Sequence, residues 1–314
     1  ERNRSIISQI TTLMEYRMNF HEYIRAVGTG PKSNRELTKD EILDAMDSIL
    51  NQKVHSEQIA AFLLGWRVRL ETVEELKTAL EVCNKYVKKI NIDNSIELGY
   101  PFDGKADNPY LLPLIPKYLK KFNLKLVVSG DEIQPAKKGL TIKELYKNVE
   151  FDQDIHYFDR KEYFKELSDL SNIRNILGLR TAFNTIEKLL NPGNSTYAVN
   201  AAFHKPYVSK YNQIFGDNYK NLVIVKGNEG TPEIFSKCKY WLTDNGKINE
   251  YIVDPEYFGI NYKKSNNIIS KEESLAMTKN PSNELEKLAK LNAAMFLVAA
   301  QKVDNIKIAF EMIE

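Results

Sequence analysis

The stretch Leu177 to Pro192, LGLRTAFNTIEKLLNP, places polar groups where an ordinary amphipathic helix does not need them. Arg180 stands at the start of a helical pattern, and Asn184 falls among its apolar positions. Burying a guanidinium or an amide without a partner is costly, so such groups usually sit where they bind something. The pattern indicates a ligand-binding corner. The alternative is an amphipathic helix that simply begins with an arginine.

A glycine-bounded turn, Gly99 to Gly104, precedes Lys105 and an apolar segment that is typical of a helix. A turn of this kind can aim backbone N–H groups and the positive end of a helix at a phosphate. Pro101 weakens the pattern because it has no N–H to donate. The turn is therefore a phosphate-binding candidate whose own residues argue partly against it.

Basic residues outnumber acidic ones between Lys117 and Lys147. Such an excess is typical of a surface that binds a polyanion, and it also occurs on a merely solvated face. Both interpretations stay open at this point. The candidate nucleic-acid contacts in this segment are Lys117, Lys120, Lys121, Lys137 and Lys138.

Histidines and cysteines give little support for other chemistry. No spacing among the four histidines suggests zinc, and only His204 is connected here with a site, with a core or helix-capping role as the alternative. Cys83 and Cys238 lie far apart and lack metal-ligand spacing. They are typical of reduced cysteines in a cytoplasmic protein.

The composition is that of a folded protein, and its small net charge gives no strong overall electrostatic field. The 314 residues are 43% hydrophobic and 27% charged, and the formal net charge is +2. The longest apolar run, Ala293 to Ala300, is far shorter than the roughly 20 residues that span a membrane. No membrane partner is expected.

The first ninety residues show helical periodicity. Helices are predicted over 37–50, 56–69 and 72–87, and two of them open with capping boxes at Thr38–Glu41 and Thr72–Glu75. Short helices joined by short connections predict a small bundle.

The middle of the chain changes period. Short β-rich runs at 125–129 and 221–226 are each followed by a glycine and come after helical patterns at 111–122 and 205–215. This alternation predicts βαβ units and a parallel sheet, whose ligands bind at the carboxyl ends of the strands. A long helix is predicted over 284–303.

Four segments resemble the anthranilate phosphoribosyltransferase family, which shares its fold with pyrimidine nucleoside phosphorylases. They are LTKDEILDAMDSIL, QIAAFLLGWRVRLETVEEL, the Arg-Thr-x-Phe-Asn run from Arg180 to Asn184, and KLAKLNAAMFLVAAQKVDN. The resemblance covers most of the chain. It implies an α/β protein with a small N-terminal helical domain, residues 1–90, joined by helices near 160–190. A larger α/β domain with a mainly parallel sheet would follow over residues 91–314.

The resemblance also implies roles for individual residues. Arg180 would orient an acceptor whose pocket Asn184 and His204 line. The phosphates of a phosphorylated sugar or nucleotide-like ligand would contact the turn from Gly99 to Gly104 and the lysine that follows it. Two carboxylates later in the chain would bind Mg²⁺. These residues are Gly99, Asp103, Gly104 and Lys105 for the phosphates, and Glu229 and Glu233 for the metal. The alternative for Glu229 and Glu233 is a loop with two exposed glutamates.

The chain departs from the family at three places. Tyr100-Pro101-Phe102 replaces the centre of the Gly-Thr-Gly-Gly-Asp-Gly loop, which removes a donor and the room for close backbone approach. Asp131 and Glu132 stand where the family has Asn and Arg, and they would repel a pyrophosphate. Pro232 removes one magnesium ligand. These departures resemble a divergent branch of the family whose members have been linked to nucleic-acid binding.

Two functions remain open. The protein is either a pentosyl- or phosphoribosyltransferase-like enzyme that does not make phosphoribosylanthranilate, or a binder of single-stranded nucleic acid that uses a basic cleft. In the second case the lysines would neutralise phosphates, and Tyr110, Tyr118 and Tyr146 would stack on bases.

A homodimer through the helical domain is expected under both functions. The resemblance implies this contact, and one apolar stripe at helical spacing supports it because it is expected to be exposed. The stripe consists of Ile59, Phe62, Leu63 and Trp66.

Overall fold

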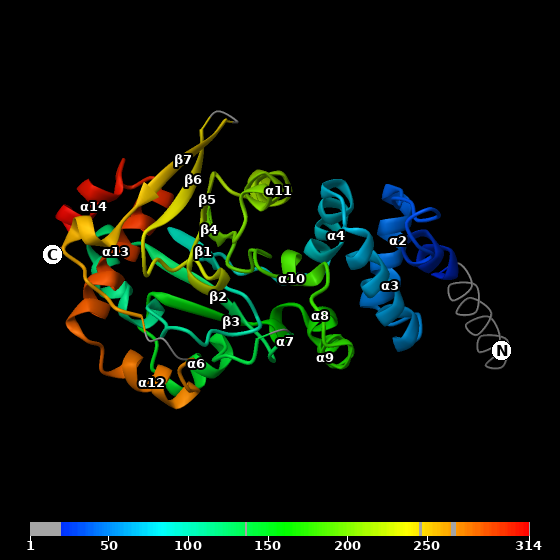
Figure 1. Ribbon diagram of the computed structural model, residues 1–314, viewed down its shortest axis with the longest axis horizontal. Helices are drawn as coiled ribbons and strands as arrows, with labels where there is room; N and C mark the ends of the chain where they lie inside the picture. Colours follow the sequence, from blue (N-terminus) through cyan, green and yellow to red (C-terminus); the bar gives the residue numbers. More distant parts are fainter. Residues whose placement is uncertain (1–19, 136, 245–246, 265–267, 314) are drawn as a thin grey trace.

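The computed structural model describes residues 20–313 except 136, 245–246 and 265–267. A mixed sheet with helices around it occupies one end of the molecule, and a layer of helices from the first part of the chain occupies the other (Figure 1). Within the described residues, no helix is long and apolar enough to cross a membrane.

The sheet has seven strands in the order β3-β2-β1-β4-β5-β6-β7. The first five pair in parallel, and β6 and β7 add an antiparallel hairpin to the β5 edge. Their bounds are β1 Ser95–Gly99, β2 Lys125–Gly130, β3 Ile155–Asp159, β4 Tyr197–Ala201, β5 Asn221–Val225, β6 Cys238–Asp244 and β7 Lys247–Val253.

Alternating strand residues face two separate apolar cores. On one face, Leu98, Val199 and Val223 pack with the long helix α13, Asn283–Ala299. On the other face, Leu222 and Ile224 join a core that continues into the helical layer. The central strands β1, β4 and β5 are therefore buried on both sides, as parallel sheets require.

The helical layer is built from α2 Lys39–Leu50, α3 Ser56–Arg69 and α4 Val73–Tyr86. Both predicted capping boxes form, with Thr38 and Thr72 as N-caps. Residues 160–177 form three short helices, α7 Arg160–Tyr163, α8 Lys165–Asp169 and α9 Ser171–Leu177. Their Leu167 and Leu170 lie in the same core as Phe62 of α3.

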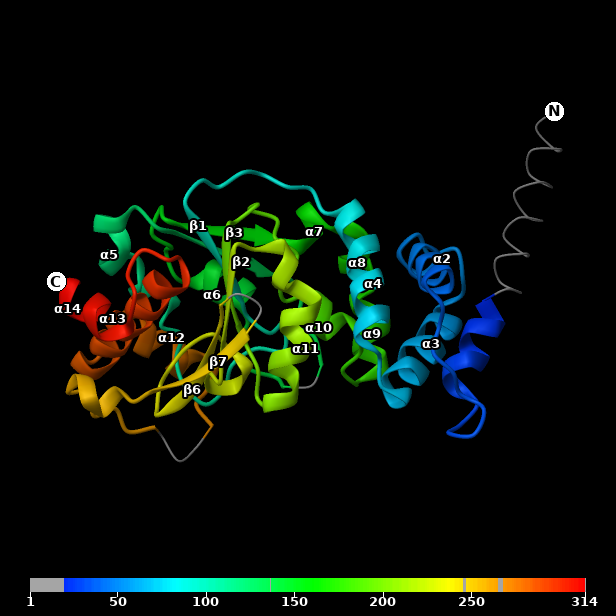
Figure 2. The same cartoon turned by 90° about the horizontal axis from the view of Figure 1, so that it is seen from above.

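The remaining elements surround the sheet. Helix α4 packs against α11, and Figure 2 shows α10 beside both. The other α-helices are α5 Pro116–Leu119, α6 Ile142–Asn148, α10 Phe183–Ile186, α11 Lys205–Phe215, α12 Lys271–Lys279 and α14 Ile306–Met312. The 3-10 helices are η1 Leu112–Leu114, η2 Lys120–Phe122, η3 Gly216–Asn218, η4 Asn228–Gly230 and η5 Pro255–Phe258.

The predicted fold class is confirmed, but two local predictions are wrong. The continuous helix expected over 111–122 is three short turns, because Pro113 and Pro116 interrupt it. The apolar stripe expected on the surface lies inside the helical core, where its four residues are at most 1% exposed. The stripe therefore gives no support to a homodimer, which stays a prediction, as does the domain boundary near residue 90.

One strand carries a buried carboxylate on the side of the helical layer. Glu97 of β1 is 1% exposed, and its Oε1 accepts a hydrogen bond of 3.1 Å from the backbone N–H of Asn191. Its Oε2 accepts from the hydroxyl of Tyr219. Burial raises the pKa of Glu97 to about 7, although both hydrogen bonds act in the opposite direction.

This carboxyl group makes stability depend on pH. Below about pH 4.5 it is protonated in both the folded and the unfolded chain. Between about pH 4.5 and 7 the unfolded chain releases the proton while the folded chain keeps it, so stability falls as pH rises. As the pH rises from 5 to 8, we expect the free energy of unfolding of Glu97→Gln to increase by about 2 to 3 kcal/mol relative to that of the wild type.

Chemical denaturation at the two pH values measures this difference. Glu162→Gln, on an exposed position of α7, is the control and should follow the wild type. Parallel pH profiles for wild type and Glu97→Gln would contradict the assignment.

Candidate functional site

A cleft of about 1040 Å³ lies where β1, β4 and β5 end. It is lined by residues 101–103 after β1, residues 226–230 after β5, and Tyr207 and Tyr211 on the first turns of α11. The corner before α10 closes it through Arg180 to Thr185. This is the edge at which ligands of parallel sheets bind.

The described lining is rich in cations. Three carboxylates face eight lysines and arginines, so the cleft favours an anionic ligand. Most of these cations are already paired with acidic side chains, whereas Lys188 and Lys226 have no ion pair among the described residues. The cations are Arg67, Lys137, Arg180, Lys188, Lys226, Lys237, Lys239 and Lys264, and the carboxylates are Asp103, Asp107 and Glu229.

Six of the predicted site residues line this cleft, namely Asp103, Lys137, Arg180, Asn184, His204 and Glu229. Arg180, which is half exposed, forms an ion pair with buried Asp103. The Oδ1 of Asn184 accepts from the backbone N–H of Thr181 at 2.8 Å, so the amide also fixes the corner. His204 is exposed on the rim, at the N-cap of α11, and its ring lies 4.7 Å from that of Phe203.

The predicted phosphate turn divides between the cleft and the core. Pro101, Phe102 and Asp103 line the cleft, whereas Tyr100 and Lys105 point into the core. Gly104 has φ +80°, and a Cβ there would lie 2.4 Å from the carbonyl oxygen of Gly139.

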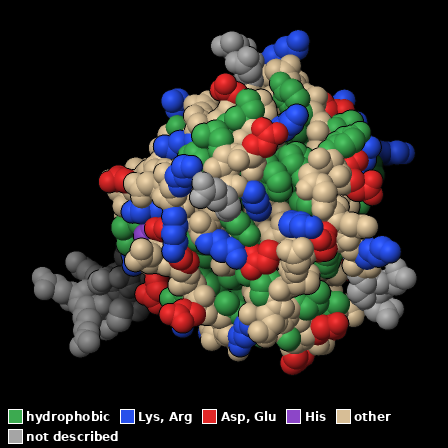
Figure 3. Space-filling model, turned by 90° about the vertical axis from the view of Figure 1, so that its left-hand side faces the viewer, with side chains coloured by type: hydrophobic (Ala, Val, Ile, Leu, Met, Phe, Trp, Pro, Cys, Tyr) green, Lys and Arg blue, Asp and Glu red, His purple; other side chains and the backbone are tan. Residues whose placement is uncertain are grey.

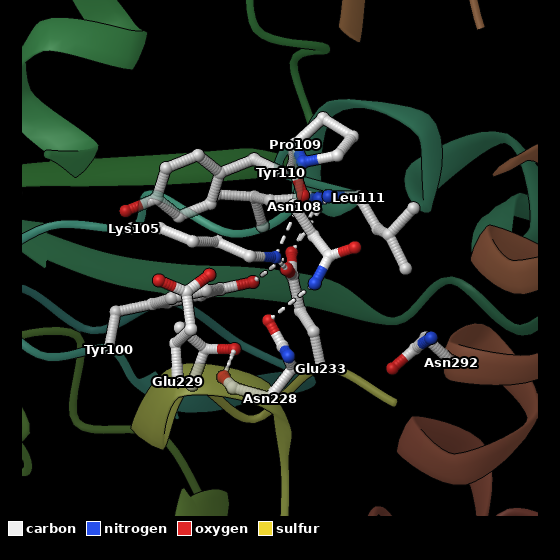
Figure 4. Close-up of polar contacts among 12 residues, drawn as sticks. Tyr100, Lys105, Asn108, Pro109, Tyr110, Leu111, Asn228, Glu229, Glu233 and Asn292 are labelled. Carbon is white, nitrogen blue, oxygen red and sulfur yellow. Dashed lines mark hydrogen bonds and ion pairs between the residues drawn. The ribbon is translucent and has the colours of Figure 1, made fainter. Parts of the chain in front are cut away.

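Glu233 lies wholly inside the fold, where several donors converge on its carboxylate (Figure 4). Lys105 forms an ion pair with Oε2, and its Nζ also donates to the carbonyl oxygen of Pro109 at 2.7 Å. Oε1 accepts from the Tyr100 hydroxyl at 2.9 Å and from the backbone N–H groups of Leu111 and Leu112 at 2.9 and 3.1 Å. Burial lowers the pKa of Lys105, and the charge of Glu233 opposes that shift.

Glu229 is also occupied by donors. Its two oxygens accept from the backbone N–H groups of Ala106 and Asp107 at 2.7 and 3.0 Å. Lys137 lies 3.7 Å from Oε1. Neighbouring loops are tied together in the same way, since Asn108 donates to the side chain of Asn228 at 2.9 Å. The two predicted metal ligands thus hold loops together, and no group of three or more potential ligands forms anywhere in the described chain.

A second buried charge network lies behind the cleft. Arg160 pairs with both Asp131 and Glu187, and Arg174 makes two hydrogen bonds to Glu187 at 2.7 and 2.9 Å. These side chains are at most 1% exposed. The expected repulsion of a pyrophosphate by Asp131 is therefore wrong, because Arg160 neutralises that carboxylate away from the cleft.

The candidate nucleic-acid lysines do not form one surface. Lys120 and Lys121 lie just before the start of β2, whereas Lys137 and Lys138 follow its carboxyl end. The two groups therefore lie at opposite ends of the strands. Lys117 and Lys120 pair with Glu286 and Asp152 at 2.5 and 3.1 Å. On the side shown in Figure 3, basic and acidic side chains are interspersed.

The expected stacking tyrosines also separate. Tyr110 is fully buried, and its hydroxyl donates to the carbonyl oxygen of Leu140 at 2.8 Å, so its proposed stacking role is wrong. Tyr118 bonds to Glu286, and Tyr146 already stacks on Tyr157 with ring centroids 4.2 Å apart.

The sequence reasoning missed Lys188, the buried lysine of the cleft. It stands in the run Glu187-Lys188-Leu189-Leu190, directly before the Asn-Pro stop. An amine inside a segment that must be buried was the available signal, because such a group needs a partner or a function. The sequence reasoning also missed Phe203 and Lys226. The Nζ of Lys226 lies 5.8 Å from the ring centroid of Phe203.

Two family models match the chain. The helical bundle domain of a glycosyl transferase family matches residues 21–85, and the a/b domain of a glycosyl transferase family matches residues 144–314. The second match alone covers more than half of the chain. The chain belongs to this glycosyl transferase family. It is an anthranilate phosphoribosyltransferase-like member of the family, as its relatives indicate.

The chain is 30% identical over 235 residues to an uncharacterized protein from Aquifex aeolicus (strain VF5), and the match spans 73% of this chain and 75% of that protein. It is 27% identical over 314 residues to an anthranilate phosphoribosyltransferase from Neisseria meningitidis serogroup C (strain 053442), over 90% and 88% of the two chains.

Solved structures show the same fold. The anthranilate phosphoribosyltransferase from Thermus thermophilus superposes with a TM-score of 0.73 at 16% identity, over 93% of this chain and 92% of that one. The enzyme from Saccharomyces cerevisiae, in complex with PRPP and Mg, gives a TM-score of 0.72 at 15% identity over 94% and 92%. PRPP is phosphoribosyl pyrophosphate.

The Arg160–Glu187 network is expected to dominate the stability of this region. Glu187→Gln leaves two buried guanidinium groups without a full counter-charge, so we expect a loss of about 3 to 5 kcal/mol in the free energy of unfolding. Asp169→Asn, which removes the partner of exposed Lys165, is the control and should cause no measurable loss. Urea denaturation measures both, and equal effects would contradict a structural role for the network.

Proposed function

We propose that this protein binds a phosphorylated pentose compound in the cleft without a divalent metal ion, and that it does not make phosphoribosylanthranilate. The observation that carries the proposal is the state of Glu233. Lys105 and Tyr100, both buried, occupy the carboxylate that the family resemblance assigns to magnesium. The ammonium group of Lys105 supplies the positive charge that a metal ion would supply there.

The carboxylates do not fit a magnesium ion as they are folded. Mg²⁺ needs oxygen ligands in near-octahedral geometry and usually takes one or two carboxylates. Both oxygens of Glu233 and both oxygens of Glu229 accept hydrogen bonds from the protein. A metal ion would have to displace Lys105 from a fully buried position, and this would leave an uncompensated charge.

The cleft keeps what a phosphorylated ligand needs. Lys226 is exposed and has no acidic partner among the described residues, so its ammonium group is available to phosphate oxygens. Arg180, half exposed on the opposite corner, offers a planar guanidinium for a second anionic group. Asn184 and His204 line the same space, which supports their assignment to the ligand pocket.

Calorimetric titration with ribose 5-phosphate and with PRPP tests this function. We expect saturable binding with affinities in Mg²⁺ and in EDTA that agree within about twofold, because no metal takes part. Lys226→Met should weaken binding about tenfold, which corresponds to about 1.4 kcal/mol. Lys39→Met, at an exposed position of α2, is the matched control and should bind as the wild type does.

Two outcomes would contradict the proposal. Binding that requires Mg²⁺ and is lost in Glu233→Gln would restore the metal site. An absence of heat with either ligand at millimolar concentration would exclude the phosphorylated pentose.

A second candidate function, binding of single-stranded nucleic acid, is favoured by the aromatic rim of the same cleft. Phe203 is 65% exposed and Tyr207 half-buried, and both stand next to the cleft cations. Base stacking on exposed aromatic rings combined with phosphate contacts is the usual basis of such binding.

Fluorescence anisotropy of a labelled oligonucleotide across a salt series tests this candidate. We expect affinity to fall as salt rises, and Lys226→Met to lower both the affinity and the salt slope, because one phosphate contact is lost. Lys121→Met, at the other edge of the sheet, should change neither. A larger effect of Lys121→Met than of Lys226→Met would place nucleic acid outside the cleft.

A further inference from the structure

We propose that Lys188 is a nucleophile that captures the aldehyde carbon of a phosphorylated pentose as a Schiff base. The inference rests on the proposed function, because it requires such a ligand to enter the cleft. It adds a covalent step and names the chemical class of the ligand, a pentose phosphate in its open-chain aldehyde form.

Lys188 is buried in the cleft wall and has no acidic partner among the residues that the structure describes. It is 8% exposed, and its Nζ donates to the backbone carbonyl oxygens of Ala201 at 3.1 Å and Gly230 at 3.4 Å. Its ammonium position lies 5.7 Å from the ring centroid of Tyr211. Two carbonyl oxygens use two of the three N–H bonds of an ammonium group, so the third position is open to a ligand.

The other buried lysine of this site provides a direct comparison. Lys105 is 1% exposed, and the carboxylate of Glu233 is its direct counter-charge. Lys188 is also buried, and no carboxylate pairs with it within the described part of the chain. A buried lysine whose charge is not compensated gives up its proton readily, and neutral amines of this kind serve as Schiff-base nucleophiles.

The surroundings of Lys188 lower its pKa on balance. Burial lowers the pKa of Lys188 to about 7, Asp103 opposes the shift, and Arg180 and Lys137 add to it. Near neutral pH a large share of the side chain is therefore the free amine, which is the form that attacks a carbonyl carbon.

Two unpartnered polar atoms in the same cleft fit a sugar. Oδ1 of Asp103 and Oγ1 of Thr181 are buried and lack a hydrogen-bond partner in the described part of the chain. Both residues line the cleft. A carboxylate oxygen accepts from a sugar hydroxyl, and a threonine hydroxyl can donate and accept, so the hydroxyl groups of a pentose would satisfy both atoms.

The reaction balances without another reactant. The free amine of Lys188 attacks the aldehyde carbon, the N–C bond forms, and the carbonyl π electrons move to oxygen, which takes a proton to give a carbinolamine. Loss of that hydroxyl group with a proton releases water and leaves the C=N bond. The amine and the aldehyde thus give an imine and one water molecule, with no change in oxidation state.

Reductive trapping tests the proposal. The full chain is incubated with ribose 5-phosphate and sodium cyanoborohydride at pH 7, and peptide mapping by mass spectrometry locates the adduct. We expect one adduct per chain at Lys188, with the mass of ribose 5-phosphate less one water plus two hydrogens. Lys188→Arg, which keeps the charge and removes the nucleophile, should lower trapping at least tenfold, and Lys39→Met should leave it unchanged.

Calorimetry of the same samples separates the possible failures. Binding of ribose 5-phosphate without an adduct at Lys188 would overturn the Schiff base and keep the proposed function. An absence of both would overturn both. If Lys188→Arg does not fold, as judged by circular dichroism, Lys188→Met takes its place, since a methionine fits the apolar stem.

A second arm distinguishes the source of the pentose. A single-stranded oligonucleotide with one abasic site carries the same aldehyde within a nucleic acid. Trapping of this oligonucleotide at Lys188 with higher efficiency than ribose 5-phosphate would assign the aldehyde to nucleic acid, and the reverse order would assign it to a free sugar phosphate. Adducts spread over surface lysines with both ligands would overturn the proposal.

Discussion

The buried ion pair between Lys105 and Glu233 is the interaction on which the architecture of the site depends. It joins the segment after β1 to the loop that follows β5, and Tyr100 and two backbone N–H groups complete the coordination of the carboxylate. If the two loops moved apart, the pair would separate and leave uncompensated charges in a dry interior, which is costly. The pair therefore fixes the two loops relative to each other. The ligand space lies outside this contact, between the loops and α11.

The chain thus combines the family fold with a different use of its charges. The family match places this protein in a glycosyl transferase family, and the solved structures share its fold. Function nevertheless depends on the site and not on the fold. Here the carboxylates at the strand ends are satisfied by internal donors. Among the cleft cations, Lys188 and Lys226 have no ion pair in the described part of the chain and remain for a ligand. We propose that the ammonium group of Lys105 replaces the charge of a metal ion beside Glu233, and that Lys188 acts as a nucleophile.

The sequence predicts those features that depend on local chemistry. The capping boxes at Thr38 and Thr72 mark the helix starts, and β5 is an apolar run before a glycine. Strand β1 was not predicted, because Glu97 interrupts its apolar run. That glutamate is tolerated only through Tyr219 and Asn191, about a hundred residues away. The donors to Glu233 lie 121 to 133 residues away in sequence, and the acceptors of Lys188 lie 13 and 42 residues away. The roles of both side chains therefore required the structure.

Electron paramagnetic resonance of Mn²⁺, used as a probe for divalent ions, tests most directly whether the carboxylate of Glu233 can bind a metal ion. Titration of the wild-type protein with Mn²⁺ follows the loss of the free-ion signal. Because Lys105 occupies the carboxylate, we expect no bound ion at millimolar concentration. One bound Mn²⁺ per chain, absent in Glu233→Gln, would contradict the claim and return the site to metal-dependent phosphoribosyl transfer.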